Sequence, residues 1–277
     1  MLQNGYIRKV SRISTSEEDV LQCFIVEHCK TPDAILLYKF CNLGDAYVDY
    51  IKVLLDAGED PQRPKDGYGT SDVNPFVIAC RRGFTEIYQS MLPYVNINRI
   101  GDGVEYYMTP LSYASAGGHI DIIESLLSLG AKVDPIIDFD YKPLSKAIDN
   151  HHIDAVNILC QNGAKIDGQI YRACLSGIVA IYDILLLYGA NVYELDENEQ
   201  SCLTMATLSG NAEMVERVIN MKVDINQQII EGDTALHYAC KHKYEEIIDI
   251  LLKAGAGPNI QNDNGEVSLK IMLVTNP

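Results

Sequence analysis

The chain has 277 residues, 47% of them hydrophobic, and its 38 Asp and Glu against 22 Lys and Arg give a net charge of −16. Nucleic acids and anionic membranes bind basic surfaces, so this balance argues against both as the main ligand. It favours a partner of basic or mixed charge.

The N-terminal residues 1–33 predict a capping region with a helix of its own. Ser16 is a suitable N-cap, acidic residues follow it, and apolar residues then recur on one face as far as Cys29. Thr31 and Pro32 are suited to begin another helix.

From about residue 34 onward the sequence repeats itself. The clearest copies are residues 109–134, TPLSYASAGGHIDIIESLLSLGAKVD, and residues 234–259, TALHYACKHKYEEIIDILLKAGAGPN. Aligned on the apolar third residue, the copies are spaced by 35, 33, 26, 33, 33 and 33 residues. These third residues are Phe76, Leu111, Leu144, Ile170, Leu203, Leu236 and Leu269.

Each copy predicts two short helices. In residues 109–134, Thr109 can cap the first helix and Pro110 fits its first turn. Gly118 separates it from a second helix with an apolar stripe, and Gly130 ends that helix. The stripe consists of Ile122, Ile123, Leu126 and Leu127. Such a unit cannot bury its apolar face alone, so neighbouring copies must stack.

A period near 33 with a T-P-L-H-x-A start resembles the ankyrin repeat. The resemblance covers residues 34–277 and implies about seven repeats. The first, Ala34 to Gly58, is degenerate, and the last stops after Leu269 and Met272, before its second helix. The implied fold is an all-α solenoid of helix-turn-helix pairs with projecting β-hairpin loops.

Two irregularities interrupt the pattern. Val95 and Lys222 replace the glycine that ends the second helix in the other copies, which should loosen those turns. The connector from Gly163 to Ile170 spans 7 residues, where most others span 14. One projecting loop is therefore expected to be absent. Either this is drift in a tolerant loop or it creates a notch.

The sequence contains no arrangement typical of catalysis. The eight cysteines lack C-x-x-C pairs and zinc spacing, so we expect neither a metal nor a cofactor. Several occupy small-residue positions in helices and are predicted to be buried, reduced thiols. Such thiols suit the cytoplasm or another intracellular compartment, including that of a host cell into which the protein is delivered. The resemblance implies that His119 and His237 hydrogen-bond the connector backbone.

The resemblance also implies that a partner protein binds the exposed ends of the first helices and the connector tips. At the helix ends the candidate residues are Arg81, Arg82, Asp149, Asn150, Leu175, Leu208, Lys241 and His242. On the connectors they are Tyr106, Tyr107, Phe139, Tyr141, Tyr193, Ile229 and Ile230. Exposed apolar residues favour an interface, although the rings could instead pack within the loops and the leucines against each other.

The predicted function is that of a monomeric, non-enzymatic protein-protein interaction module, a scaffold or adaptor. The first alternative is an effector or inhibitor that blocks a target enzyme by the same contacts. The second is a small-molecule or catalytic site in the notch near residues 163–171.

Overall fold

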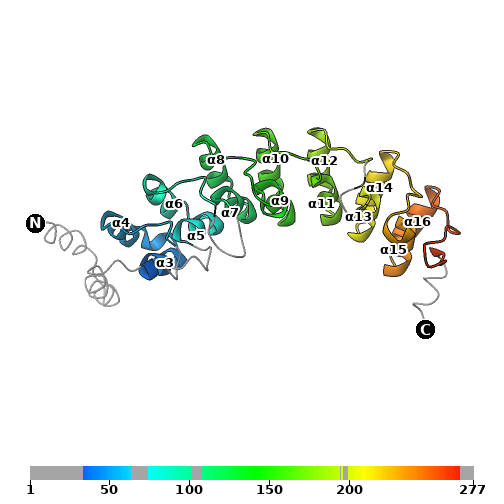
Figure 1. Cartoon of the computed structure of the whole chain (residues 1–277), viewed down its shortest axis with the longest axis horizontal. Coiled ribbons are helices and arrows are strands. Elements are labelled where there is room, and N and C mark those ends of the chain that lie inside the picture. The colour runs from blue at the N-terminus through cyan, green and yellow to red at the C-terminus, as the bar shows by residue number, and fades with distance from the viewer. Residues whose placement is uncertain (1–33, 64–73, 101–107, 194, 196–198, 269–277) are drawn as a thin grey trace, which may run out of the picture. The chain divides into compact units, whose positions relative to one another are not determined.

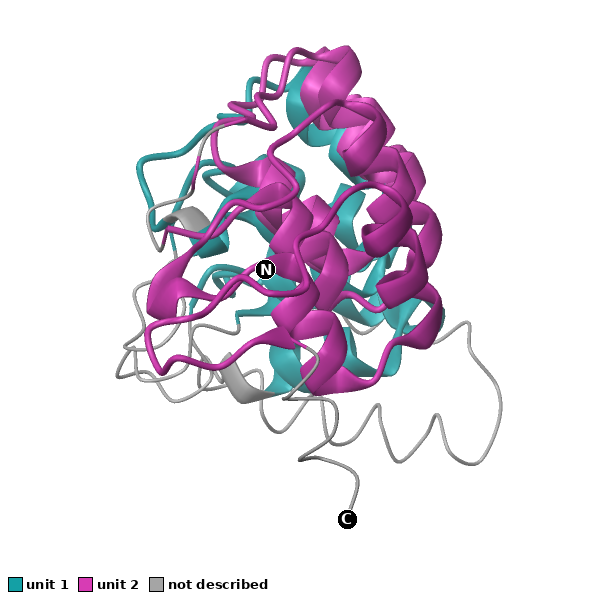
Figure 2. Ribbon diagram, turned by 90° about the vertical axis from the view of Figure 1, so that its right-hand side faces the viewer, with its two compact units in different colours: residues 1–143 teal, residues 144–277 magenta. Residues whose placement is uncertain are grey.

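The computed structural model describes residues 34–63, 74–100, 108–193, 195 and 199–268 (Figure 1). The chain divides into two compact units, residues 1–143 and residues 144–277, which Figure 2 colours separately. The predicted capping region at residues 1–33 lies outside the described residues.

Unit 1 is built from helix pairs, each consisting of a first and a second helix. The pairs are α3 (Ala34–Leu43) with α4 (Val48–Asp56), α5 (Pro75–Arg82) with α6 (Thr85–Met91), and α7 (Pro110–Gly117) with α8 (Ile120–Ser128). Short 3-10 turns accompany them: η1 (Asp45–Tyr47), η2 (Leu92–Tyr94) and η3 (Phe139–Tyr141).

Unit 2 follows the same plan, and its first helix begins at the boundary residue Pro143. The pairs are α9 (Pro143–Asp149) with α10 (Ile153–Gln161), α11 (Gln169–Ser176) with α12 (Val179–Leu187), α13 (Cys202–Leu208) with α14 (Ala212–Asn220), and α15 (Ala235–His242) with α16 (Glu245–Lys253). The turn η4 (Ile230–Gly232) precedes α15. The all-α architecture of helix pairs that the sequence predicts is confirmed.

The first helices begin where the sequence supplies a cap. The hydroxyl of Thr109 accepts a 3.2 Å hydrogen bond from the backbone N–H of Ser112, and Pro110 occupies the first turn. Asn74 and Ser201 cap α5 and α13 in the same way. A side-chain acceptor satisfies an N–H that has no partner within the helix, so these residues fix where each first helix starts.

Left-handed turns separate and end the helices. Gly118 joins α7 to α8 with φ 68°, and Gly130 follows α8 with φ 87°. Lys222 adopts the same turn with φ 61°, so the chain closes there in spite of the missing glycine. At Val95 the backbone is extended instead (φ −123°), because α6 passes into the 3-10 turn η2.

Within each unit, first helices pack on first helices and second on second. In unit 1, α5 contacts both α3 and α7. In unit 2, α13 contacts α11 and α15, while α14 contacts α12 and α16. The second-helix stripes supply the core, although not every stripe residue is buried. In α8, Ile122, Ile123 and Leu126 are buried and Leu127 is half-buried, and in α10 Cys160 is buried while Ile158 is half-buried.

The connectors differ from the expected β-hairpins. Among the described residues they contain turns and one isolated antiparallel bridge, between Gln261 and Val267, but no regular strand. Side-chain amides join successive connectors instead. Asn98 accepts a 2.8 Å hydrogen bond from the N–H of Lys132 and donates to the carbonyl of Gly130. Each such amide links two connectors by hydrogen bonds at one point, whereas paired strands would link them along their whole length.

Candidate partner-binding surface

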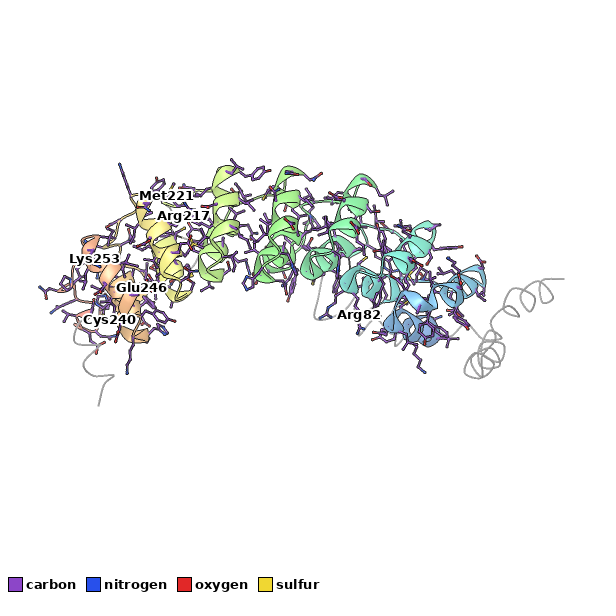
Figure 3. All side chains as sticks on the ribbon, turned by 180° about the vertical axis from the view of Figure 1, so that it is seen from behind. Arg82, Arg217, Met221, Cys240, Glu246 and Lys253 are labelled. Atoms are coloured by element: carbon purple, nitrogen blue, oxygen red, sulfur yellow. The ribbon has the colours of Figure 1, made fainter. Side chains whose placement is uncertain are left out.

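The ends of the first helices lie along one edge of unit 2. In Figure 3, Cys240 of α15 lies on the opposite edge from Arg217 and Met221, which belong to α14 and its C-terminal end. The first helices α11, α13 and α15 pack in succession, so their C-terminal residues are neighbours. This first-helix edge carries the predicted residues from Leu175 to His242.

In unit 1, the predicted cations Arg81 and Arg82 are exposed at the end of α5. The Arg82 guanidinium donates a 3.2 Å hydrogen bond to the carbonyl of Asn42, at the end of α3. The carbonyl of Arg81 is 2.9 Å from Nε2 of His119. The Arg81 backbone is thus held by His119, and the Arg82 guanidinium itself contacts the end of α3, while both residues remain exposed to solvent.

At the end of α9, Asp149 and Asn150 are exposed, but Asp149 is engaged by cations. It forms ion pairs with Arg172 of α11, at 2.6 Å, and with Lys146, at 3.7 Å. The repeat pattern did not predict a role for Arg172, because no motif includes its position, three residues before Leu175. The pair neutralises the one acidic end among the predicted helix ends of unit 2.

The two predicted leucines differ in exposure. Leu175, at the end of α11, is 49% exposed, whereas Leu208, at the end of α13, is half-buried. Because α11 and α13 pack together, the two leucines end neighbouring helices on the first-helix edge, and these two positions are called the strip. Leucine at half exposure keeps apolar surface in water that a partner could cover.

Cations end the strip at α15. Lys241 and His242 are both exposed, and the His242 ring stacks on Tyr244 with centroids 5.5 Å apart. Positive charge at a helix C-terminus interacts favourably with the helix dipole, so these residues also stabilise α15.

The connector residues have mixed outcomes. Tyr193 is 65% exposed and donates a 3.0 Å hydrogen bond to the carbonyl of Met221, and Ile230 is 46% exposed. The prediction of an exposed Ile229 is wrong: it is 6% exposed, because its backbone pairs with Asp233 and turns its side chain into the core. Tyr141 is half-buried in η3.

Three other predicted connector groups lie outside what the structure describes: Tyr106, Tyr107 and the side chain of Phe139.

The two histidines singled out by the sequence have different roles. His237 is buried. Its Nδ1 lies 2.8 Å from the hydroxyl of Thr234, and its Nε2 lies 3.2 Å from the connector carbonyl of Glu266, as predicted. His119 instead contacts the carbonyl of Arg81 at a helix end, so the prediction of a connector contact is wrong for this residue.

The short connector between α10 and α11 is bridged by a buried hydrogen bond. The amide of Gln169 donates to the hydroxyl of Ser145 at 2.8 Å, and both residues are fully buried. Gln169, Ile170 and Tyr171 belong to the core rather than to an accessible surface. The notch hypothesis therefore draws no support from these three side chains.

The described thiols lack the features of nucleophiles. Six cysteines are free and buried, and burial raises the pKa of Cys160 to about 11. Burial likewise raises the pKa of Cys41, Cys80 and Cys240. Reactive cysteines have a lowered pKa and partial exposure, so these residues serve packing. Within the described ranges, no three His, Cys, Asp or Glu residues cluster as metal ligands would, and none of the helices is long and apolar enough to cross a membrane.

Comparison with known proteins gives consistent matches. A family model described as ankyrin repeats (3 copies) matches residues 36–137, 100–170 and 170–262. Human Ankyrin repeat domain-containing protein 40 is 32% identical over 76 residues, covering 27% of this chain and 21% of the relative. Ankyrin repeat protein OPG189 of variola virus is 29% identical over 150 residues, covering 48% of this chain and 25% of the relative. This chain thus spans only about a quarter or less of the length of these two relatives.

The solved structure of the human ASB11 ankyrin repeat domain is similar, with a TM-score of 0.66. It covers 72% of this chain and 91% of its own, at 23% identity, so this likeness concerns the fold alone.

Proposed function

The chain belongs to the ankyrin repeat family, and on that premise we propose that it is a non-enzymatic protein-binding module that acts as a scaffold or adaptor. Ankyrin repeats generally serve protein-protein interaction. A partner would bind the first-helix edge of unit 2 and the exposed connector residues beside it.

The observation that carries this proposal is the exposure of Leu175. A leucine that is 49% exposed at the end of α11, next to a half-buried Leu208, is not required by the packing of either helix. A few large apolar contacts dominate the binding energy of most interfaces, and polar or charged neighbours form the rim. Lys241 and His242 supply such a rim at the α15 end of the strip.

In unit 1 we propose that Arg81 and Arg82 contribute a second contact region. Both are exposed. The carbonyl of Arg81 is held by His119, and the Arg82 guanidinium donates one hydrogen bond to the carbonyl of Asn42, which positions it at the surface. Guanidinium groups bind carboxylates with two parallel hydrogen bonds, so this region fits acidic groups of a partner with mixed charge.

The experiment that tests the function is a comparison of three immobilised full-length chains in a pull-down from lysate. They are the wild type, the double variant Leu175→Ala with Leu208→Ala, and a control, Leu187→Ala, which changes a 79% exposed leucine at the end of α12. A protein retained by wild type and control but lost by the double variant is then purified and titrated. We expect binding weaker by about tenfold or more in the double variant, with unchanged far-UV circular dichroism.

A partner that binds all three chains equally well contradicts the assignment of the first-helix edge. Should the partner be an enzyme, its activity in the presence of the chain separates an inhibitor from a passive adaptor, because only an inhibitor lowers the rate.

We further propose an intracellular location. Six free, buried cysteines are more compatible with a reducing compartment than with secretion through an oxidising one. Fractionation of cells that express the chain, with detection by antibody, tests this.

A further inference from the structure

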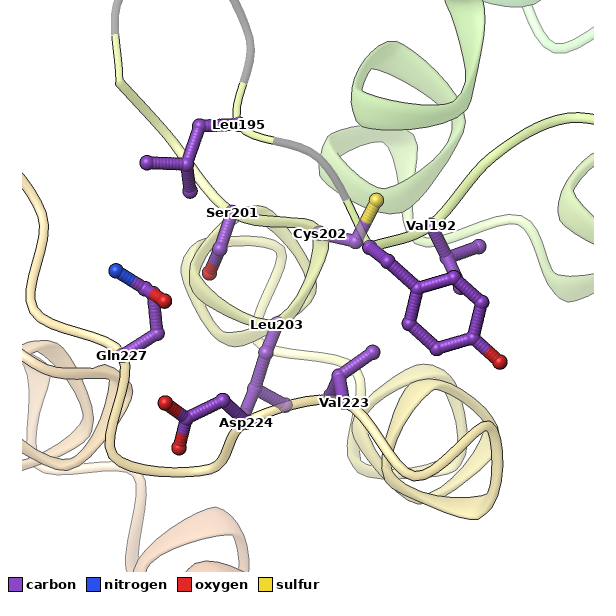
Figure 4. A pocket seen from close by; sticks show the side chains of 9 residues that line it. Val192, Leu195, Ser201, Cys202, Leu203, Val223, Asp224 and Gln227 are labelled. Atoms are coloured by element: carbon purple, nitrogen blue, oxygen red, sulfur yellow. The ribbon is translucent and has the colours of Figure 1, made fainter.

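A small pocket lies within unit 2, between the connector that follows α12 and the connector that follows α14 (Figure 4). It is separate from the first-helix edge proposed above, because its lining residues come from the two connectors and the start of α13. The residues that matter for its chemistry are Val192, Leu203 and Val223 on its apolar side, and Ser201, Asp224 and Gln227 on its polar side.

The volume of the pocket limits what can enter. It measures about 50 Å³. This space is large enough for a small group to enter, since a cavity needs only about 10–15 Å³ to hold one water. Cofactors and drug-sized ligands need roughly 300–1,000 Å³. The end of a single side chain fits, and a small-molecule cofactor does not.

The walls select an amphipathic side chain. Val192 and Leu203 are buried, so the floor of the pocket is part of the hydrophobic core. In Figure 4, Val192 and Val223 lie on one side of Leu203, whereas Ser201, Asp224 and Gln227 lie on the other. An occupant must therefore place methylene groups against the valines and a polar group against the carboxylate.

The polar side presents acceptors that are held in place. A carboxylate oxygen of Asp224 accepts a 2.9 Å hydrogen bond from the backbone N–H of Asn226, which fixes the side chain. The amide nitrogen of Gln227 donates to the carbonyl of Gln228 at 2.9 Å, and Figure 4 shows the amide oxygen on the side of Ser201 and Asp224. A negative charge beside a neutral acceptor suits a cationic donor.

The surrounding sequence has the same sign of charge. The connector from Ala190 to Ser201 contains four acidic residues and no Lys or Arg. The acidic residues are Glu194, Asp196, Glu197 and Glu199. Of these four, Glu199 lies among the described residues, where it is exposed.

From these observations we propose that the pocket binds a lysine side chain from a partner protein. This inference rests on the proposed function, because it names the chemistry of a partner segment. Beyond its β-carbon a lysine has three methylene carbons and one ammonium nitrogen. The methylenes pack on Val192, Leu203 and Val223, and the ammonium group donates to Asp224 and Gln227. Arginine is longer and carries a wider planar group, which suits a small pocket less well.

The test uses the isotope-labelled full-length chain and capped tripeptides as probes. Acetyl-Gly-Lys-Gly-amide is titrated while amide chemical shifts are recorded by NMR, with the norleucine and arginine tripeptides as comparisons. Norleucine keeps the aliphatic stem and lacks the charge. We expect saturable shifts at residues 223–227 and at the Gln227 side-chain amide, with a dissociation constant on the order of millimolar. The norleucine and arginine peptides should bind at least about tenfold more weakly.

Two matched variants locate the charge. Asp224→Asn keeps an oxygen that accepts from Asn226 and removes the negative charge, so it should weaken lysine binding about tenfold. Asp249→Asn removes one exposed charge from α16 of the same unit and should leave binding unchanged. Equal binding of the norleucine or arginine peptide, an unaffected Asp224→Asn variant, or an equal loss in Asp249→Asn would each overturn the proposal.

The outcome is separable from that of the proposed function. If no lysine peptide binds, and the Leu175→Ala with Leu208→Ala variant still loses its partner, the pocket assignment fails and the protein-binding function stands. If the peptide binds at residues 223–227, and no partner depends on the first-helix edge, the pocket stands and that edge is wrong.

Discussion

The side-chain amide of Gln169, at the start of α11, donates a 2.8 Å hydrogen bond to the hydroxyl of Ser145 in α9, and both side chains are fully buried. Ser145 occupies the repeat position that His237 occupies in α15. There the histidine Nε2 lies 3.2 Å from the carbonyl of Glu266 in a connector of ordinary length. Where the connector is short, a glutamine from the next helix takes over the contact.

Disrupting this bond should destabilise unit 2. Ser145→Ala leaves the buried amide of Gln169 without its acceptor, and Gln169→Met leaves the hydroxyl without its donor, so each should lower the free energy of unfolding by about 1–3 kcal/mol. The free energy of unfolding lost in the double variant should be smaller than the sum of the losses in the two single variants. Urea denaturation of all four chains gives the coupling free energy, about 1 kcal/mol if the bond is as described. Strictly additive losses would mean that the two side chains do not interact.

Two equivalent tyrosines provide a second, matched test. Tyr88 and Tyr182 each lie 12 residues after the repeat's aligned apolar residue, and both are buried. The hydroxyl of Tyr88 donates to Ser125 at 3.0 Å, whereas the hydroxyl of Tyr182 has no hydrogen-bond partner. In the repeat that follows the one containing Tyr182, Arg217 occupies the position equivalent to Ser125, and it forms an ion pair with Asp183. Tyr88→Phe should therefore cost about 1 kcal/mol, and Tyr182→Phe should be neutral or stabilising.

Thermal and urea unfolding of the two phenylalanine variants checks this. A larger loss for Tyr182→Phe than for Tyr88→Phe would show that the hydroxyl of Tyr182 does have a partner.

The helix-helix turns offer sites for stabilisation. Lys243 (φ 58°) and His151 (φ 63°) adopt the left-handed conformation that glycine adopts in the other described turns, such as Gly118. Side chains disfavour this region by about 1–2 kcal/mol, and the greater freedom of glycine in the unfolded chain offsets part of that. Lys243→Gly and His151→Gly should each raise the free energy of unfolding by about 0.5–1 kcal/mol. Gly118→Ala, as a control, should lower it; a gain in that variant would contradict the strain argument.

Stability should fall in alkaline solution. Burial raises the pKa of Cys160 from 9.0 to about 11, and it raises that of Tyr88 from 10.0 to about 12. The folded state thus keeps protons that the unfolded state releases. The stabilisation is complete below pH 9, declines from there, and is lost as the pH passes through 11 for Cys160 and 12 for Tyr88. Each group lowers the free energy of unfolding by up to about 1.4 kcal/mol per pH unit within its range.

Urea midpoints measured in reducing buffer from pH 7 to about pH 11 test the decline. Cys160→Val should make the decline shallower between pH 9 and 11, the interval between the two pKa values of that thiol, while Cys41, Cys80 and Cys240, whose pKa burial also raises, keep the rest of it. A midpoint that is constant over this interval in both chains would show that the buried groups do not titrate on unfolding.

The helix pairs were predictable because the signals for them are local. Thr109, Pro110, Gly118 and Gly130 act within a few residues of their own positions, so their spacing alone locates the start, the turn and the end of a pair. The apolar stripe was predictable for the same reason, since helix periodicity assigns it to one face. Periodicity did not distinguish Leu127, the last residue of that stripe, which is only half-buried.

The candidate site was only partly predictable. Leu175 and Lys241 are exposed at the C-terminal ends of first helices, a location that follows from the repeat, although Leu208 at the equivalent position of α13 is half-buried. Ile229 is buried because a left-handed turn at Glu231 (φ 64°) and Gly232 (φ 71°) redirects the chain. Asp149 is paired with Arg172, 23 residues away, which no local pattern indicates.

By itself, therefore, the sequence determined the repeated helix pair and the stacking that its apolar stripe requires, because capping, turn geometry and helix periodicity act over a few residues. Only the tertiary structure decided how Gln169 closes the short connector, which tyrosine has a partner, and that Asp224 and Val192 line one pocket. Those relationships depend on which side chains meet across separate helices and connectors. Such contacts depend on how whole helices and connectors pack, and the spacing of residues along the chain does not predict them.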